Sequence, residues 1–270
     1  MIEPVKQPVV MTIAGFDPSG GAGVLADVKT ISAFECYGVA VLTSLTFQNT
    51  QQVFGLVHQT ADSVGQQIDL LFDDFQIAAI KTGMLPTAEI IRTVADVIKA
   101  RPVPLVVDPV WKSTSGFALV DEQATEALTK SLFPLASLVT PNLAEARQLT
   151  GFEVRTLDEM ERAARVIMRL GSRAVLITGG DGVSDIANDV LIDAQGLEVF
   201  STQRIYSKGT HGTGCTFASA VTCLLALGFS VRESIPIAKK YISQAILGAP
   251  HLGHGQGPVN HFPRGFKIRD

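Results

Sequence analysis

The sequence predicts a three-layer α/β fold, in which helices cover both faces of a mostly parallel central sheet. Short apolar runs rich in β-branched residues alternate with helical patterns along most of the 270 residues. This is the order in which helices connect parallel strands. Most of these runs are apolar throughout, as expected for strands buried on both faces. Hydrophobic residues make up 46% of the chain, which is enough to cover such a sheet on both sides.

The predicted elements follow one another in the order that this fold requires. The expected strands are Val9–Gly15, Val39–Phe47, Ala78–Met84, Leu105–Val110, Ser137–Thr140 and Ala174–Thr178. The expected helices are Val24–Cys36, Ala61–Asp74, Thr87–Lys99, Asp121–Leu132, Leu143–Leu149, Leu157–Leu170, Phe217–Leu227 and Val231–Leu247. A hairpin is predicted from Asp189–Ala194 to Leu197–Thr202, turning at Gly196. No repeat or linker interrupts this order, so residues 1–270 are expected to form a single domain.

The composition excludes several classes of protein. The formal net charge is −4 and Lys and Arg form no cluster, so neither nucleic acid nor an anionic membrane surface is an expected partner. The longest apolar run, Phe217–Phe229, has about 13 residues, short of the ~20 that span a bilayer. Met1–Gln7 lacks the apolar centre of a signal peptide, so a cytoplasmic protein is expected. Cys36 and Cys223 are interpreted as small buried hydrophobic residues.

A glycine-rich segment, Lys208–Thr216, leads directly into the apolar run that predicts a helix. Gly212 and Gly214 leave backbone N–H groups unpaired at the helix start, where the positive end of the helix dipole also lies. Such a position binds anions, including phosphate. Cys215 lies within it, and a thiol in a phosphate-binding turn indicates chemistry on a phosphoryl group. The alternative is an ordinary glycine-rich loop that enters a buried helix.

The loop after the first predicted strand, Ala14–Gly23, contains four glycines, which allow the backbone to approach a ligand closely. It does not match the GxGxxG pattern of dinucleotide-binding proteins, so a nicotinamide-dependent oxidoreductase is disfavoured. Asp27 follows on the first turns of the next helix. Its carboxylate either accepts a hydrogen bond from an amino group or protonated ring of a ligand, or only stabilises the helix start.

Polar residues stand where further strands end, and ligands of doubly wound sheets collect at the carboxyl ends of the strands. Gln48 suits the edge of a heterocycle and Met84 suits the face of a flat ring, unless they are a loop glutamine and a core methionine. Asp108 is placed to hold Mg²⁺ directly or through water. Asn142 and Glu145 either bind a metal and phosphate oxygens together or form a capping box.

Several short motifs occur in one order along the chain. They are AGFDPSGGAG from Ala14, Ala26-Asp27, Lys29-Thr30, Gln48-Asn49-Thr50, Gly83-Met84-Leu85, Asp108-Pro109-Val110, Ser115-Gly116, Thr140-Pro141-Asn142 with Glu145, THGTGCT from Thr210, and Gly257-Pro258-Val259. Each is weak alone. Together, from about Val9 to Phe262, they resemble the ribokinase-like superfamily, and within it the hydroxymethylpyrimidine and phosphomethylpyrimidine kinases of thiamine biosynthesis.

The resemblance implies phosphoryl transfer from ATP, with Mg²⁺, to 4-amino-5-hydroxymethyl-2-methylpyrimidine and then to its monophosphate. It assigns contacts with the pyrimidine to Gln48, Asp27, Gly15, Met84 and Val110. It assigns the catalytic turn to Gly212, Thr213, Gly214 and Cys215. ATP contacts fall on Asn142, Glu145, Thr178, Gly180 and Thr210, and metal contacts on Asp108 and Glu145. Relatives are commonly dimeric, so a homodimer is expected.

Cys215 occupies the position where much of the superfamily has an aspartate that acts as base on the acceptor hydroxyl. Because helix N-termini lower the pKa of a thiol, Cys215 is expected to be a thiolate that accepts the hydroxyl proton. A covalent phosphocysteine is disfavoured, since direct in-line transfer needs no such intermediate.

The chain departs from the commoner family pattern at several positions. Thr178 stands where a lysine often precedes the glycine pair, and Asp181 where a histidine is usual, so the cation that meets the ATP phosphates is left to Lys112 or Lys208. The segment Trp111–Thr114 replaces an apolar run that ends in lysine.

Two alternatives on the same fold stay open, a pyridoxal kinase and a catalytically silent sensor of a vitamin precursor. Gln48, Asp27 and Cys215 count against the first. The intact glycine turn and the polar residues at the strand ends count against the second, which Thr178 favours.

Overall fold

A computed structural model of the protein describes residues 7–112, 116–117, 119–120, 122–182 and 184–268. Its centre is a nine-stranded sheet with the order β3-β2-β1-β4-β5-β6-β7-β8-β9. The strands are β1 Val9–Phe16, β2 Tyr37–Gln48, β3 Val53–His58, β4 Ile77–Thr82, β5 Leu105–Val107, β6 Leu138–Val139, β7 Val175–Ile177, β8 Ile186–Asp193 and β9 Gly196–Gln203. The expected strands and the expected hairpin are therefore present.

The sheet is mostly parallel, as predicted. Strands β1, β2, β4, β5, β6 and β7 run parallel to their neighbours, whereas β3 is antiparallel to β2 and the β8–β9 hairpin is antiparallel to β7. Strand β3 was not expected, because its residues include Gly55 and lack a regular alternation of apolar and polar side chains. It forms one edge of the sheet, and β9 forms the other.

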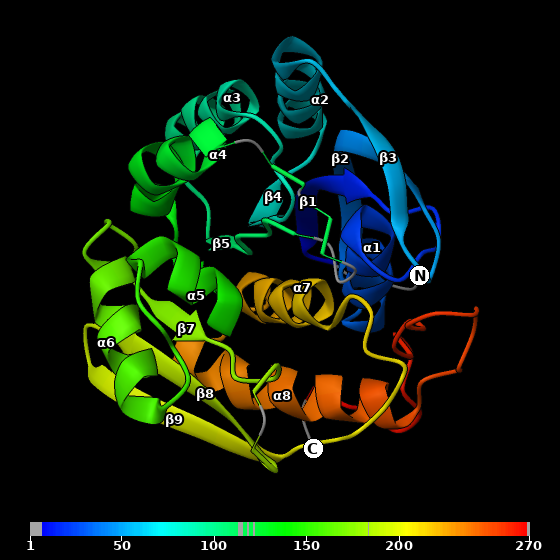
Figure 1. Ribbon diagram of the computed structural model, residues 1–270. Coiled ribbons are helices and arrows are strands. Elements are labelled where there is room, and N and C mark those ends of the chain that lie inside the picture. Colours follow the sequence, from blue (N-terminus) through cyan, green and yellow to red (C-terminus); the bar gives the residue numbers. More distant parts are fainter. Residues whose placement is uncertain (1–6, 113–115, 118, 121, 183, 269–270) are drawn as a thin grey trace, which may run out of the picture.

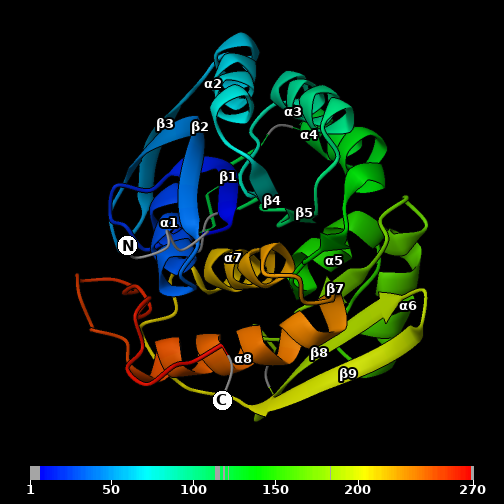
Figure 2. The same ribbon diagram turned by 180° about the vertical axis from the view of Figure 1, so that it is seen from behind.

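Helices cover both faces of the sheet (Figures 1 and 2). The helices are α1 Gly23–Ala33, α2 Ala61–Asp74, α3 Ala88–Ala100, α4 Glu122–Ala127, α5 Leu143–Thr150, α6 Leu157–Met168, α7 Thr213–Ala226 and α8 Val231–Leu247. Helices α1, α7 and α8 pack on one face, and α2 to α6 on the other. Among the described residues, no helix combines the length and apolar character needed to span a bilayer.

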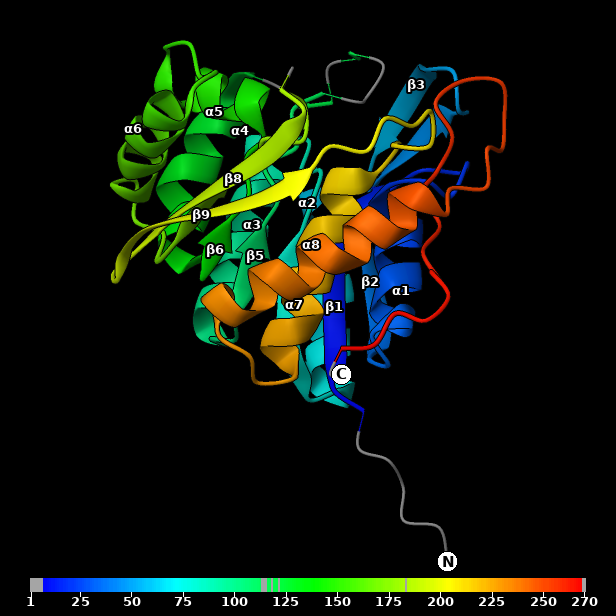
Figure 3. The ribbon, with the colours of Figure 1, turned by 90° about the horizontal axis from the view of Figure 1, so that it is seen from below.

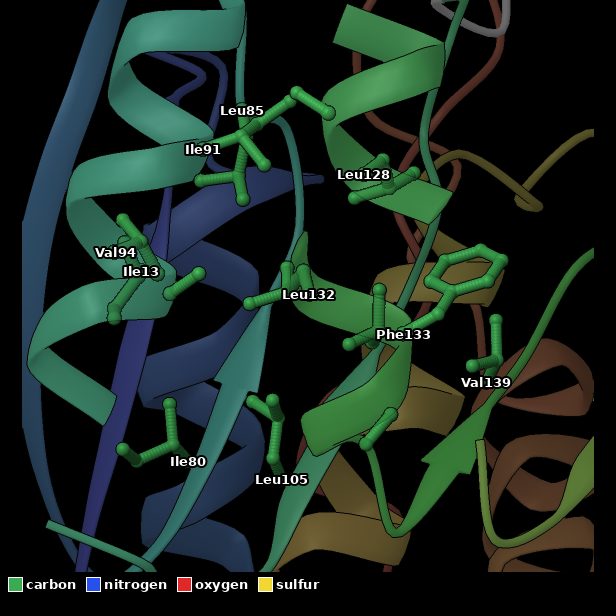
Figure 4. Packing of buried hydrophobic residues seen from close by; sticks show 14 of the residues in the cluster. Ile13, Ile80, Leu85, Ile91, Val94, Leu105, Leu128, Leu132, Phe133 and Val139 are labelled. Carbon is green, nitrogen blue, oxygen red and sulfur yellow. The ribbon is translucent and has the colours of Figure 1, made fainter. Parts of the chain in front are cut away.

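The two faces of the sheet bury separate hydrophobic cores, because successive side chains of a strand point to opposite sides. In β1, Val10 belongs to the core under α7 and α8, whereas Met11 belongs to the core under α3 and α6. Figure 4 shows the second core, where Ile13, Ile80 and Leu105 of the strands pack against side chains of α3 and the helical segment that follows α4. The sheet is thus buried on both sides, which explains its continuous apolar runs.

Several element boundaries differ from the prediction for local reasons. Helix α7 begins at Thr213 rather than Phe217, because Gly212 is its N-cap and the first turn is built from small residues before the apolar run. Strand β5 ends before Asp108-Pro109, since proline cannot donate to the sheet. The predicted helix at 121–132 is α4 followed by a π-helical turn, Leu128–Leu132. Its expected first residue, Asp121, lies outside the described residues, as do Ser113–Ser115 of the motifs above.

The strand order fixes where a ligand binds. From β1 the chain builds outward to β2 and β3 on one side and to β4 and the later strands on the other, so the order reverses beside β1. Crevices at the carboxyl ends of the strands next to such a reversal are ligand sites in open α/β sheets. The C-terminal segment passes near the turn between β2 and β3 (Figure 3). There the backbone N–H of Gln256 donates to the carbonyl oxygen of Thr50 at 2.9 Å.

Candidate active site

A cavity of about 1110 Å³ opens at the carboxyl ends of the strands. Its lining includes fourteen of the fifteen residues expected from the sequence to form the site: Gly15, Gln48, Met84, Asp108, Val110, Asn142, Glu145, Thr178, Gly180, Thr210, Gly212, Thr213, Gly214 and Cys215. Asp27 is the exception. The residues come from loops that lie far apart in the sequence, and the parallel sheet brings them together.

The glycine-rich turn before α7 forms one wall of this cavity. Gly212 has a φ of 77°, and a Cβ added there would lie 1.8 Å from the carbonyl oxygen of Gly21, so only glycine fits. The first backbone N–H groups of α7 have no acceptor within the helix and lie at the positive end of its dipole. No Cβ added at Gly214 would meet a described atom within 4 Å, so the space over this turn is open. The turn is therefore shaped to receive an anion.

A hydrogen bond joins this turn to the loop after β1. Nε2 of His211 lies 2.8 Å from Oδ2 of Asp17, and both side chains are buried. Asp17 also accepts hydrogen bonds from the backbone N–H groups of Ser19 and Ala22. Burial raises the pKa of Asp17, but the hydrogen bonds from His211 and Ser19 outweigh it and leave this pKa below its usual value. The two glycine-rich loops are thus held together by an ionised carboxylate.

Cys215 lies half-buried in the first turn of α7 and lines the cavity. Its expected low pKa is contradicted: the pKa of the thiol is raised to about 12, because burial, together with the charges of Asp108 and Asp27, outweighs the opposing charge of Lys81. The desolvation of the thiol and the charges of the two carboxylates raise its pKa more than the helix N-terminus lowers it. Cys215 is therefore a neutral thiol near pH 7 in this structure.

Asp27 lies beneath the cavity instead of lining it. Its carboxylate is fully buried and accepts hydrogen bonds from Thr12 at 2.6 Å, Ser219 at 2.8 Å and Lys81 at 3.0 Å. The expected contact with a ligand amino group does not match this position. Burial lowers the pKa of Lys81, but the charge of Asp27 outweighs it and holds this pKa above its usual value. Sequence reasoning missed Lys81, although a lysine within an otherwise apolar strand was a signal.

Two carboxylates face the cavity beside the glycine turn. Burial raises the pKa of Asp108 to about 6, and the nearby charge of Lys81 only partly offsets it. Burial also raises the pKa of Glu145 well above its usual value, and the charge of Asp108 raises it further. The Oδ2 atom of Asp108 is buried without a hydrogen-bond partner among the described residues, and the Nζ atom of Lys81 lies 3.8 Å away. These carboxylates need a further positive charge.

Mg²⁺ fits this need. It binds through one or two carboxylates and completes its shell with water and phosphate oxygens. Asp108 and Glu145 supply this number of ligands, and the unpartnered oxygen of Asp108 is available to an ion. No group of three or more His, Cys, Asp or Glu residues within the described ranges forms a cage for a metal. The donor set therefore suits a metal that arrives with phosphates better than a permanently held one.

The helix start at Asn142 is a capping box and a part of the cavity at the same time. The side chain of Asn142 accepts from the N–H of Glu145, and Oε2 of Glu145 accepts from the N–H of Asn142, both at 2.9 Å. Both residues also line the cavity. The two interpretations left open by the sequence are thus compatible.

The far end of the cavity suits a small ring. A Cβ at Gly15 would lie 2.9 Å from the sulfur of Met84, so glycine is needed for this methionine to flank the space. The amide of Gln48 lies between the hydroxyl of Thr46 at 3.1 Å and Nε2 of His211 at 3.4 Å. These contacts hold the amide at the edge of the cavity, where it presents a donor and an acceptor. Val110 lies nearby in the lining.

The opposite end of the cavity contains groups that sequence reasoning missed. The carboxylate of Asp189 accepts from the N–H of Gly179 at 2.9 Å and pairs with Lys239 at 2.5 Å. Arg204, just beyond β9, also lines the cavity. Of the two cations expected to meet ATP, Lys112 lines the cavity and Lys208 does not. A charged residue on an apolar helix face, as at Lys239, was the available signal.

Comparison with known proteins identifies the family. A family model described as phosphomethylpyrimidine kinase matches residues 17–260. A thiamine biosynthesis bifunctional protein, ThiED, of Geobacter sulfurreducens is 45% identical over 99% of this chain, which spans 55% of that protein. A hydroxymethylpyrimidine/phosphomethylpyrimidine kinase of Staphylococcus aureus is 42% identical, with 96% of this chain and 95% of the relative covered.

Solved structures agree with this assignment. Bacillus subtilis pyridoxal kinase in complex with ADP superposes with a TM-score of 0.88 at 38% identity, covering 96% of this chain and 98% of that one. A phosphomethylpyrimidine kinase of Clostridium difficile superposes with a TM-score of 0.79 at 38% identity, covering 89% and 100%. These structures share the ribokinase-like fold expected from the motifs. By its sequence and its fold, the chain belongs to the phosphomethylpyrimidine kinase family.

Proposed function

We propose that this protein transfers a phosphoryl group from ATP to 4-amino-5-hydroxymethyl-2-methylpyrimidine and then to its monophosphate, in thiamine biosynthesis. The observation that carries the proposal is the composition of the cavity. Its lining combines the glycine turn with Cys215, the carboxylates Asp108 and Glu145, and, at Gln48, space for a small ring. The names of the relatives in Geobacter and Staphylococcus support the same activity. The free cysteines fit a reducing compartment, and we propose the cytoplasm.

The groups of the cavity divide the work of phosphoryl transfer. The backbone N–H groups of Gly212, Gly214 and Cys215 face the transferred group and stabilise the charge that gathers on it, whereas the N–H of Thr213 donates to the carbonyl oxygen of Thr210. Gln48 and Met84 orient the pyrimidine, so that its hydroxymethyl group meets the phosphoryl group in line. Asn142, Glu145, Thr178, Gly180 and Thr210 hold the nucleotide. Mg²⁺, when bound at Asp108 and Glu145, neutralises charge on the phosphate oxygens.

Pyridoxal is the competing acceptor, since pyridoxal kinases superpose on this chain and pyridoxal is a similar flat ring with a hydroxymethyl group. We expect ATP consumption with the pyrimidine alcohol and with its monophosphate, and far slower consumption with pyridoxal. Purified protein, ATP and Mg²⁺ with each acceptor in turn make the measurement. A preference for pyridoxal would transfer the function to vitamin B6 salvage. No turnover with any of the three acceptors would make the protein a sensor.

We propose that Cys215 accepts the proton of the acceptor hydroxyl. With a thiol pKa of about 12, the thiolate fraction rises about tenfold for each pH unit between 7 and 10, and turnover is expected to rise with it. Cys215→Ala is expected to lose this rise and about 10²- to 10⁴-fold of kcat at little cost in KM. Cys223→Ala, on the same helix but outside the cavity, is the matched control. A Cys215→Ala enzyme with normal turnover would contradict the role.

The magnesium site is tested through Glu145, because glutamine preserves the capping box and removes only the charge. Glu145→Gln is expected to need at least about tenfold more Mg²⁺ for half-maximal activity, since one of two carboxylate ligands becomes neutral. Glu159→Gln changes the same position of a capping box in α6, away from the cavity, and serves as the control. Equal Mg²⁺ requirements of the two variants would exclude Glu145 as a ligand.

We also propose a homodimer. Leu45, Phe47 and Val57 project from one face of the β2–β3 pair, with Leu45 directly opposite Val57. Their side chains are between 38% and 57% exposed, which is a large apolar surface for a monomer. Val57→Asp is expected to convert the dimer to a monomer in light scattering. Val199→Asp, at the exposed opposite edge of the sheet, should leave the dimer intact. Wild-type protein with the mass of one chain would refute the proposal.

A further inference from the structure

Arg204 is held rigidly at the wall of the cavity by three backbone carbonyl groups. Its guanidinium donates to the carbonyl oxygens of Gly180 and Ser184, and to that of Gly179 at 3.1 Å. Its own N–H donates to the carbonyl oxygen of Asp185 at 2.8 Å. The guanidinium thus spans the loop between β7 and β8. Because a guanidinium has five N–H donors, two remain after these three contacts.

The charge of Arg204 differs from the other positive charges of the cavity because no carboxylate neutralises it. Arg147 pairs with Glu153 at 2.9 Å, and Lys239 is buried against Asp189 at 2.5 Å. Within the described ranges, no carboxylate lies within ion-pair distance of the Arg204 guanidinium. Carbonyl oxygens orient the guanidinium without cancelling its charge. Lys112 also lines the cavity, but its side chain is exposed and no hydrogen bond from it to a described residue holds it in place.

The surroundings of Arg204 indicate which part of a nucleotide lies there. Apolar side chains of Ile205, which directly follows Arg204, and of Ile242 and Ile246 line the cavity and suit the base. The glycine turn before α7, which receives the transferred phosphoryl group, lines another part of the same cavity. The remaining phosphates of ATP must connect these two regions. Arg204 and the loop that it spans stand beside this connection.

The loop is shaped for close approach of such a group. A Cβ at Gly179 would lie 2.1 Å from the carbonyl oxygen of Asn188, so the turn is packed tightly on β8. At Gly180 nothing within 4 Å would meet a Cβ, so the cavity side is open. The buried carboxylate of Asp189 that holds Gly179 repels a phosphate little, because Lys239 neutralises it. Asp181, which also lines the cavity, is a negative charge that opposes phosphate binding there.

We propose that Arg204 is the fixed cation that binds the non-transferred phosphates of ATP, in place of the lysine that is absent at Thr178. This inference rests on the proposed kinase function. It answers the question that Lys112 and Lys208 left open, since Lys208 lies outside the cavity and no hydrogen bond to a described residue holds Lys112 in place. A guanidinium suits the task because its planar donors match phosphate oxygens.

The test compares nucleotides that contain these phosphates with a nucleoside that does not. Calorimetric binding of ATP, ADP and adenosine is measured for wild-type protein, Arg204→Met and Arg204→Lys. Arg204→Met is expected to weaken ATP and ADP by about 10- to 100-fold and to leave adenosine unchanged, as for loss of a hydrogen bond to a charged group. Arg204→Lys keeps the charge but loses the hydrogen bonds to the three carbonyl oxygens. Its affinity for ATP and ADP is expected to lie between those of the wild type and Arg204→Met. In steady-state assays, KM for ATP should rise while kcat changes little.

Tyr206→Phe is the matched control, because it removes a hydrogen bond to Asp185 of the same loop from a side chain that lies outside the cavity. It is expected to bind all three ligands as the wild type does. An equal loss of adenosine and ATP in Arg204→Met would overturn the proposal, because Arg204 would then only shape the loop. Unchanged ATP binding, or a larger loss in Lys112→Met, would overturn it as well. These measurements need no acceptor, so a failure to phosphorylate pyrimidines is observed separately.

Discussion

A fully buried ion pair between Lys81 of β4 and Asp27 of α1 supports the whole site. Asp27 also accepts hydrogen bonds from Thr12 of β1 and Ser219 of α7, so one carboxylate joins two strands and two helices. These elements meet where the strand order reverses, directly under the glycine turn. Breaking a buried pair by removing one partner costs about 3–5 kcal/mol, since the other charge stays uncompensated. The position of α7, and with it Cys215, therefore depends on this pair.

The same ion pair leaves the site above it short of positive charge. Lys81 faces Asp27, Asp108 and the Cys215 thiol, but its ammonium carries a single charge. Burial therefore raises the pKa values of Asp108, Glu145 and Cys215 without full compensation. A cation that arrives with the phosphates of a nucleotide supplies what is missing. A nearby positive charge lowers the pKa of a carboxyl group, so nucleotide binding and the ionisation of Asp108 and Glu145 favour each other.

Much of the site could be predicted from the sequence because a parallel sheet sets its position. Residues that directly follow apolar strands, such as Asp108 and Asn142, must share one edge of the sheet, and the adjacent prolines fix where the strands end. The prediction failed for Asp27 because sequence does not reveal which way a side chain points from the first turns of a helix. It failed for the pKa of Cys215 because burial and neighbouring carboxylates come from distant segments. Arg204 was missed because the sequence does not reveal that the β8–β9 hairpin, which Arg204 follows, lies beside β7 in the folded sheet.

The capping box at Asn142 explains how a structural motif also serves as a binding group. A carboxylate has two oxygens, and at Glu145 the Oε2 atom accepts the N–H of Asn142, which fixes the side chain against the helix start. No described residue forms a hydrogen bond with the Oε1 atom, which is therefore available to a ligand in the cavity. Because the box is built from backbone groups of one turn, it places this oxygen without help from neighbouring loops. The same geometry therefore caps the helix and presents a binding group. Whether the second oxygen binds a ligand depends on the cavity above it.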